Sequence, residues 1–179
     1  SLSQASNSLV SNKDIITKVY FPRLIMPISS ILTNFIDFII AAFILVGLMI
    51  YYNYVPNLSG LLIIPLLVII TFLTTIGLGL FTAAANVKYR DVRYALPFFI
   101  QIMLFVTPVI YPVSILKGYS WVLALNPMTG VIEVARAAFL GNATVNYNLL
   151  LISGIVCLVL FFTGLIYFKK TEKYFADIV

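Results

Sequence analysis

The sequence predicts an all-α, polytopic integral membrane protein: a helical bundle with four transmembrane helices and two short re-entrant or interfacial outer helices. Two observations lead to this fold class. Hydrophobic residues make up 62% of the chain and charged residues only 9%, with a mean hydropathy of +1.09, whereas a soluble domain carries about 25% charged residues. The apolar residues also form continuous runs of the roughly 18 or more residues that a membrane-spanning helix needs, not the short alternating segments of a β-barrel.

Residues 1–27 form a mixed segment that we predict to be a cytoplasmic amphipathic helix followed by a bend. Basic and aromatic residues are interspersed among apolar ones, and Pro22 and Pro27 limit the extent of any helix. The chain begins with Ser1 instead of Met, and its first residues lack the apolar core of a signal peptide. We therefore expect a piece of a longer protein, with removal of a pro-segment as the weaker alternative.

The predicted transmembrane domain comprises residues 28–179. Its four spans are expected at about 28–52, 59–86, 95–113 and 147–168. In the second span, small residues recur every four positions: Thr71, Thr75, Gly79 and Ala83. A stripe of small residues lets another helix approach closely, although such residues are also common in any membrane helix.

Residues 114–146 separate the third and fourth spans and hold two apolar pieces on either side of Asn126-Pro127. Each piece is too short to cross a bilayer, and an Asn-Pro pair interrupts helical structure. We therefore predict a pair of re-entrant or interfacial helices at about 115–125 and 128–140.

The distribution of Lys and Arg predicts the orientation, because cytoplasmic loops of membrane proteins are enriched in these residues. Nine of the 11 lie in three flanking segments: 1–27, 87–94 and 169–179. Only Lys117 and Arg136 lie in the remaining connections. Both ends of this chain and the 87–94 loop are therefore predicted to be cytoplasmic, and the two short helices to be outside.

Several kinds of catalytic site are excluded by composition. The sequence contains no histidine and a single cysteine, Cys157, which excludes histidine metal sites, Ser-His-Asp triads, internal disulfides and CxxC sites. There is also no GxxxxGK[ST] phosphate-binding loop and no paired-carboxylate or metal-binding constellation. We therefore expect that the chain is not an enzyme and has no ATP-hydrolysing site of its own.

Three charged residues are candidates for a role inside or beside the membrane. Asp37 lies in the first predicted span, where a charge costs about 2.5–3.5 kcal/mol on insertion scales. It would line a transport path, pair with a basic residue, or form a hydrogen bond between helices. Glu133 and Arg136 are three residues apart and share a helix face. They would form either a surface ion pair or a polar seam that contacts substrate or another subunit.

Five segments carry motifs that matter together: "KVYFPRLIMP", "GLGLFTAAANVKYRDVRYALP", "TPVIYP", "LNPMTGVIEVARAAFLG" and "FKKTEKYFADIV". Their order resembles the ABC-2 type permease subunits of the polysaccharide and polyol phosphate exporter family, the bacterial exporters of O-antigen, capsule and teichoic acid. The resemblance extends over essentially the whole chain. Two alternatives remain: an ABC-2 permease for drugs or other lipids, and a secondary transporter, which would show internal repeats and interrupted spans.

The resemblance implies a six-span half-transporter that dimerises with a second copy and recruits two copies of a separate ABC ATPase. Two further spans would precede Ser1. ATP and Mg would bind to the ATPase, so no cofactor is expected on this chain. The substrate would be a lipid-linked glycan or polyol-phosphate polymer, moved outward across the bacterial cytoplasmic (inner or plasma) membrane. Membrane lipid is the other expected partner, and nucleic acid is not expected.

The resemblance also implies roles for particular residues. It assigns coupling to the ATPase to two cytoplasmic segments, through Lys18, Tyr20, Phe21, Pro22, Arg23, Lys88, Tyr89, Arg90, Asp91, Val92 and Arg93. It assigns the outer gate or substrate path to Pro108, Tyr111, Pro112, Trp121, Asn126, Pro127, Glu133 and Arg136.

Overall fold

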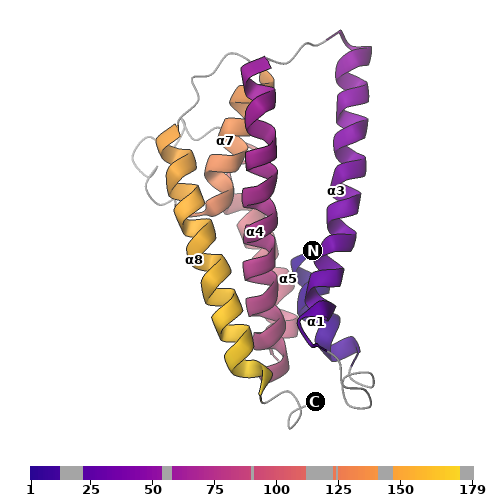
Figure 1. Ribbon diagram of the computed structural model, residues 1–179, viewed down its shortest axis with the longest axis vertical. Coiled ribbons are helices and arrows are strands. Elements are labelled where there is room, and N and C mark those ends of the chain that lie inside the picture. Colours follow the sequence, from indigo (N-terminus) through magenta and orange to yellow (C-terminus); the bar gives the residue numbers. More distant parts are fainter. Residues whose placement is uncertain are drawn as a thin grey trace. The chain divides into compact units, whose positions relative to one another are not determined.

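The computed structural model describes residues 1–12, 22–53, 58–89, 91–111, 123, 125–140 and 147–173. In this part of the chain every regular element is a helix (Figure 1). The helices are α1 (Leu2–Ser11), α3 (Ile25–Tyr51), α4 (Leu58–Lys88), α5 (Val92–Val106), α7 (Pro127–Leu140) and α8 (Tyr147–Glu172). The predicted all-α class is therefore confirmed for the described residues.

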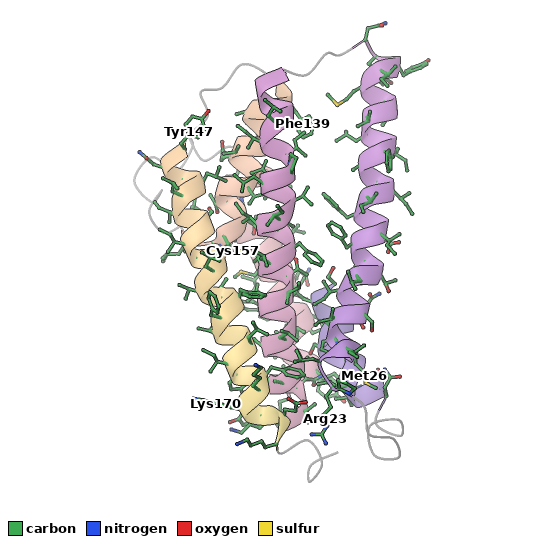
Figure 2. All side chains as sticks on the ribbon, in the orientation of Figure 1. Arg23, Met26, Phe139, Tyr147, Cys157 and Lys170 are labelled. Carbon is green, nitrogen blue, oxygen red and sulfur yellow. The ribbon has the colours of Figure 1, made fainter. Side chains whose placement is uncertain are left out.

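Three helices are long and apolar enough to cross a membrane, by length and composition: Ile25–Tyr51, Leu62–Lys88 and Tyr147–Glu172. They correspond to the first, second and fourth predicted spans, which supports a multi-pass membrane protein. Apolar side chains are exposed along α3, as expected for a surface that faces lipid (Figure 2). Phe43, for example, is 73% exposed.

The third predicted span, 95–113, differs from the structure. The helix α5 has 15 residues and ends at Val106, and at 1.5 Å per residue its length is about 22 Å, short of a hydrocarbon core of about 30 Å. The cause is Pro108, because a proline disfavours helical backbone at the residue before it. The backbone N–H of Val109 donates to the carbonyl of Thr107 at 2.7 Å, so the chain turns immediately. The structure therefore shows three helices of spanning length and one shorter apolar helix, Val92–Val106, and the predicted count of four spans stays a prediction.

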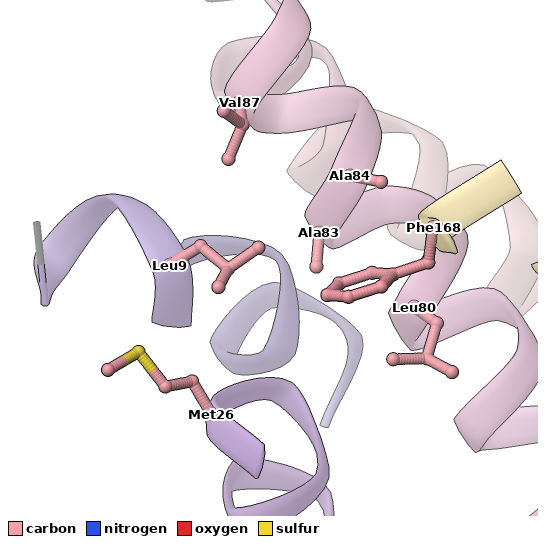
Figure 3. Packing of buried hydrophobic residues seen from close by; sticks show 7 residues of the cluster. All are labelled: Leu9, Met26, Leu80, Ala83, Ala84, Val87 and Phe168. Carbon is pink, nitrogen blue, oxygen red and sulfur yellow. The ribbon is translucent and has the colours of Figure 1, made fainter. Parts of the chain in front are cut away.

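The described chain divides into two compact units, of which the first contains Ser1–Asp37, Leu73–Ile100 and Val159–Val179. Its core is a cluster of buried apolar residues from α1, α3, α4 and α8: Leu9, Met26, Leu80, Ala83, Ala84, Val87 and Phe168 (Figure 3). The ring of Phe168 points toward Ala83 and Leu80, and its side chain is fully buried. The helix α1 joins this core through Leu9, so its apolar face packs on the bundle.

The helices α4 and α8 cross with their backbones in contact in this unit. A Cβ atom added to Gly77 would lie 2.7 Å from the carbonyl oxygen of Leu160, and one added to Gly164 would overlap the carbonyl of Gly77. Without side chains at both positions, two membrane helices can approach closely. Sequence analysis did not single out this glycine pair.

The predicted stripe of small residues faces other neighbours. A Cβ atom at Gly79 would lie 3.3 Å from the Cβ of Ala5 and 2.8 Å from the Cδ1 of Ile31, so Gly79 makes room for α1 and α3. Ala83 is fully buried in the core cluster. Thr71 and Thr75 are half-buried, and the hydroxyl of Thr71 donates to the carbonyl of Leu67 within α4 at 2.8 Å.

The second unit contains Phe38–Phe72 and Gln101–Leu158. Here α7 packs closely on α8: the backbone N–H of Gly130 in α7 donates to the hydroxyl of Ser153 in α8 at 3.1 Å. A side chain at Gly130 would overlap that hydroxyl and the carbonyl of Leu149. The single cysteine, Cys157, is buried, and its thiol donates to the carbonyl of Ile70 at 3.4 Å.

Substituting Gly164 tests the backbone contact between α4 and α8. We expect Gly164→Ala to lower the apparent melting temperature of the purified protein by several degrees, because an added methyl group must push the two helices apart, and overpacking costs about 1–3 kcal/mol. Gly154→Ala is the matched control in the same helix, since nothing lies within 4 Å of an added Cβ atom there. Equal melting temperatures for both variants would contradict the close crossing.

Candidate functional site

The connection between α4 and α5 is shorter than the predicted 87–94 loop. The helix α4 extends to Lys88 and α5 begins at Val92, so only residues 89–91 lie between them; this connection is called the 89–91 turn. The N–H of Val92 donates to the carbonyl of Tyr89 across it at 3.1 Å. The carbonyl of Asp91 accepts from the N–H groups of Tyr94 and Ala95 at 3.1 Å, and a carboxylate just before a helix interacts favourably with the helix dipole.

The predicted coupling residues at this turn are mostly exposed. Lys88, Tyr89, Asp91 and Arg93 are exposed, and Val92 is half-buried. The ammonium group of Lys88 lies 5.2 Å from the centre of the Tyr89 ring, within the range of a cation–π interaction. The turn thus presents a charged and aromatic surface on a short, helix-bounded connection. Arg90 lies outside the described residues.

A buried polar contact lies directly beside this turn. The side chain of Asn86 is 4% exposed, and its amide nitrogen donates to the Ser6 carbonyl at 2.9 Å and to the Asn7 side-chain oxygen at 3.2 Å. The Nε of Arg93 donates to the same Asn7 oxygen at 3.2 Å. Sequence analysis missed Asn7 and Asn86, although Asn86 stands three residues after Ala83 and therefore shares a face with the predicted stripe.

The other predicted coupling segment is described only at its end. Pro22 is exposed, and its carbonyl accepts from the N–H of Ile25 at 3.0 Å. Arg23 precedes α3 (Figure 2), and its guanidinium donates to the backbone carbonyl of Glu172 in the last turn of α8. Carbonyls at a helix C-terminus have no partner within the helix, so Arg23 satisfies one of them. Lys18, Tyr20 and Phe21 lie outside the described residues.

The predicted outer site begins with a cap on α7. The side-chain oxygen of Asn126 accepts from the N–H of Met128 at 3.0 Å, as expected of an N-cap asparagine, and Pro127 occupies the first helical position, which suits proline. The amide nitrogen of Asn126 donates to the Thr107 hydroxyl at 2.8 Å. The Asn-Pro pair that was predicted to interrupt the chain therefore starts α7 and joins it to the end of α5.

A second contact between α7 and the end of α5 comes from Arg136. Its guanidinium forms an ion pair with Glu133 at 3.0 Å and donates to the carbonyls of Pro108 and Val109 at 3.0 and 3.1 Å. The Arg136 and Glu133 side chains are each 25% exposed. The predicted pair is thus formed, and the arginine also binds backbone carbonyls beyond the end of a helix, where such groups lack helical partners.

The remaining predicted residues have simpler surroundings. Pro108 is fully buried, and the hydroxyl of Tyr111 donates to the carbonyls of Phe105 and Val106 at 3.1 and 3.3 Å. Asp37 is exposed on α3, and within the described part of the chain it has neither an ion pair nor a hydrogen bond to another helix. Pro112 and Trp121 lie outside the described residues, as does most of the predicted outer helix 115–125.

Comparisons with known proteins agree on one family. The model of the ABC-2 type transporter family matches residues 2–140. The chain is 30% identical over 181 residues to an O-antigen export system permease protein RfbA of Klebsiella pneumoniae, and 29% identical to a second protein of that name and species. Both alignments cover 99% of this chain and 70% of the relative. An O-antigen export system permease protein RfbA of Myxococcus xanthus is 28% identical over 180 residues, with 99% of this chain and 69% of the relative covered.

Removing the Arg136 guanidinium tests the contact between α7 and the end of α5. We expect Arg136→Ala to increase amide hydrogen exchange in residues 127–140 by about tenfold or more, because one hydrogen bond to a charged group contributes about 1.5–3 kcal/mol and two are lost to residues 108 and 109. Glu133→Gln is the control, since its amide oxygen can still accept from Arg136, and we expect a smaller effect. If hydrogen-exchange mass spectrometry showed unchanged protection in Arg136→Ala, this contact would not hold α7 in place.

Proposed function

This chain belongs to the ABC-2 type transporter family, and we propose that it is the permease subunit of an exporter that moves a lipid-linked polysaccharide or polyol-phosphate polymer outward across the bacterial cytoplasmic membrane. Membership of the family makes the chain a membrane transport subunit and not an enzyme. The observation that carries the proposed substrate and direction is the similarity, over 99% of the chain, to relatives named as O-antigen export permeases.

The energy for export is proposed to come from a partner. The family implies an ABC transporter with an ATPase, and the sequence itself contains no phosphate-binding loop. We place ATP and Mg on two copies of a separate ATPase subunit, which serve a dimer of this chain. The ATPase is proposed to bind the 89–91 turn, in which Tyr89 and Asp91 are exposed, and the segment that ends at Pro22 and Arg23.

The geometry of the α4–α5 turn supports a coupling role. A long flexible loop would absorb the movement of a docked protein, but this connection has only residues 89–91 between two helices. Its charged groups Lys88, Asp91 and Arg93 are exposed and suit an interface with electrostatic complementarity. A displacement of the turn would therefore pass directly into α4 and α5.

The short helix α7 is proposed to form part of the outer gate. It has 14 residues, which at 1.5 Å per residue gives about 21 Å, too short to cross a hydrocarbon core of about 30 Å. Asn126 and Arg136 hold it to residues 107–109. A re-entrant helix held by a few polar contacts can be released when the neighbouring helix moves, which is what opening a path for a polymer requires.

Reconstitution tests the proposed function directly. The permease with its ATPase is placed in liposomes with the ATPase facing outward, and a lipid-linked O-antigen polymer is supplied in the outer leaflet. We expect added ATP to carry the polymer into the lumen, so that it becomes inaccessible to an added lectin. An ATPase variant that binds ATP without hydrolysing it is the control. Unchanged lectin access with active ATPase would refute polymer export.

Alanine substitutions at the turn test coupling in the same system. We expect Arg90→Ala or Asp91→Ala to reduce transport-linked ATP hydrolysis severalfold, because each removes a charged group from the proposed interface with the ATPase. Thr163→Ala is the control, because its exposed hydroxyl bonds only to carbonyls of its own helix α8. Normal transport-linked ATP hydrolysis and normal polymer export in both turn variants would contradict the proposed coupling role of this turn.

A further inference from the structure

We propose that Asn7, Asn86 and Arg93 form a polar clasp that joins the two cytoplasmic segments on which the ATPase acts, so that they move as one body. This role depends on the proposed function of the chain as an ATP-driven permease. The clasp consists of three hydrogen bonds between side chains or from a side chain to the backbone: Asn86 to Ser6, Asn86 to Asn7, and Arg93 to Asn7.

The oxygen of the Asn7 side chain is the centre of the clasp. It accepts one hydrogen bond from Asn86 in α4 and one from Arg93 in α5, each at 3.2 Å. One atom of α1 thus contacts the helices on both sides of the 89–91 turn. The hydroxyl of Ser6 adds a further contact, since it donates to the carbonyl of Thr82 in α4 at 3.3 Å.

The burial of Asn86 shows that the contact is built into the fold. Burying an amide without hydrogen-bond partners is unfavourable, and Asn86 is 4% exposed. Its amide nitrogen finds both acceptors on α1. If α1 separated from α4, this amide would lose both acceptors, so the position of α1 relative to α4 is specified by polar contacts and not by apolar packing alone.

Arg93 lies at a position of α5 where a positive charge does not stabilise the helix. Arg93 is the second residue of α5, where a positive charge interacts unfavourably with the positive end of the helix dipole. The hydrogen bond from its Nε to Asn7 provides a reason for an arginine at this place. Its guanidinium belongs to the predicted coupling turn, yet it reaches back to the helix that leads to the other coupling segment.

The location of the clasp in the chain gives it a mechanical role. The helix α1 ends at Ser11, shortly before the coupling segment that includes Lys18. After that segment, Arg23 bonds to the carbonyl of Glu172 in α8. Both described flanks of the segment are therefore attached to helices of the same compact unit. With the clasp intact, a force that the ATPase exerts on one coupling segment also acts on the other. Without it, the two segments would be held together less firmly and part of the work of ATP hydrolysis would be lost.

A pair of substitutions at Asn7 separates the clasp from simple packing. Asn7→Leu keeps the size of the side chain but removes the acceptor, whereas Asn7→Asp keeps an oxygen that can accept from both donors. In the reconstituted complex, we expect Asn7→Leu to lower the amount of polymer moved per ATP hydrolysed by about fivefold or more, because about fivefold corresponds to one net hydrogen bond and the Asn7 oxygen accepts two. We expect Asn7→Asp to restore it. Ser11→Ala, one turn further along α1, should match the wild type, because its hydroxyl bonds only within α1.

A second variant covers the case that Asn7→Leu does not fold. Arg93 is exposed, so Arg93→Met should be tolerated while it removes one donor of the clasp, and it should also lower the ratio of transport to hydrolysis. Because part of the effect of Arg93 is proposed to pass through Asn7, the loss in the double variant Asn7→Leu/Arg93→Met should be smaller than the product of the two single losses. A double variant whose loss equals that product would show that Arg93 acts only elsewhere, on the ATPase, and would overturn its part in the clasp.

Hydrogen exchange of residues 2–11 in the same complex provides a measurement that does not depend on transport. Faster exchange in Asn7→Leu, but not in Asn7→Asp, is expected if the clasp holds α1. If the wild-type complex moved no polymer, the proposed function would fail while the exchange data still tested the clasp. If the wild type exported polymer and Asn7→Leu kept a normal ratio of transport to hydrolysis, the clasp would be overturned and the proposed function would stand.

Discussion

The structure depends on one constraint: in a hydrocarbon environment, polar groups must find partners inside the protein. Many hydroxyl groups of the long helices find a partner within their own helix. Those of Thr71, Thr82 and Thr163 donate to carbonyls one turn back in their own helix. Such bonds satisfy a side chain without fixing one helix to another. Thr129 is an exception among the described side chains, because its hydroxyl is buried without a partner.

Polar contacts between different helices are therefore informative, because a membrane helix does not need them for its own stability. Among the described residues, three groups of them lie near helix ends, whereas others, such as the bond from Cys157 in α8 to Ile70 in α4, lie within the helices. Arg23 binds the end of α8, the Asn7–Asn86–Arg93 clasp lies beside the α4–α5 turn, and Asn126 and Arg136 bind the end of α5. Helix ends carry carbonyls and N–H groups without helical partners. They are also the points where the proposed movement would be transmitted or released, so the same polar groups would serve both stability and the proposed function.

The sequence predicted the helices well because their signal is strong. Long uncharged runs and the distribution of Lys and Arg located α3, α4 and α8 close to their observed bounds. Boundaries set by local chemistry were less accurate: α5 ends at Val106 because of Pro108, and α4 continues to Lys88 because nothing in "NVK" stops a helix. Among the candidate sites, Asn126-Pro127 and the Glu133–Arg136 pair could be found from spacing. The clasp could not, because its partners are 79 and 86 residues apart in the chain and only packing of α1 on α4 brings them together.

The Arg136 contact and the Asn7–Asn86–Arg93 clasp differ in how a charged side chain is accommodated between helices. Arg136 lies at the predicted outer level, where a lone cation partly shielded from water would be costly. Glu133 on the same helix face neutralises it at 3.0 Å while the remaining donors of the guanidinium bind Pro108 and Val109. Glu133 thus lowers the cost of placing an arginine there, and the arginine supplies the contact between helices. At the α4–α5 turn the buried member is the neutral Asn86, and the charged member, Arg93, stays exposed. The contact between α1 and α4 therefore buries a neutral amide that needs no counter-ion, and its charged member, Arg93, remains accessible at the surface.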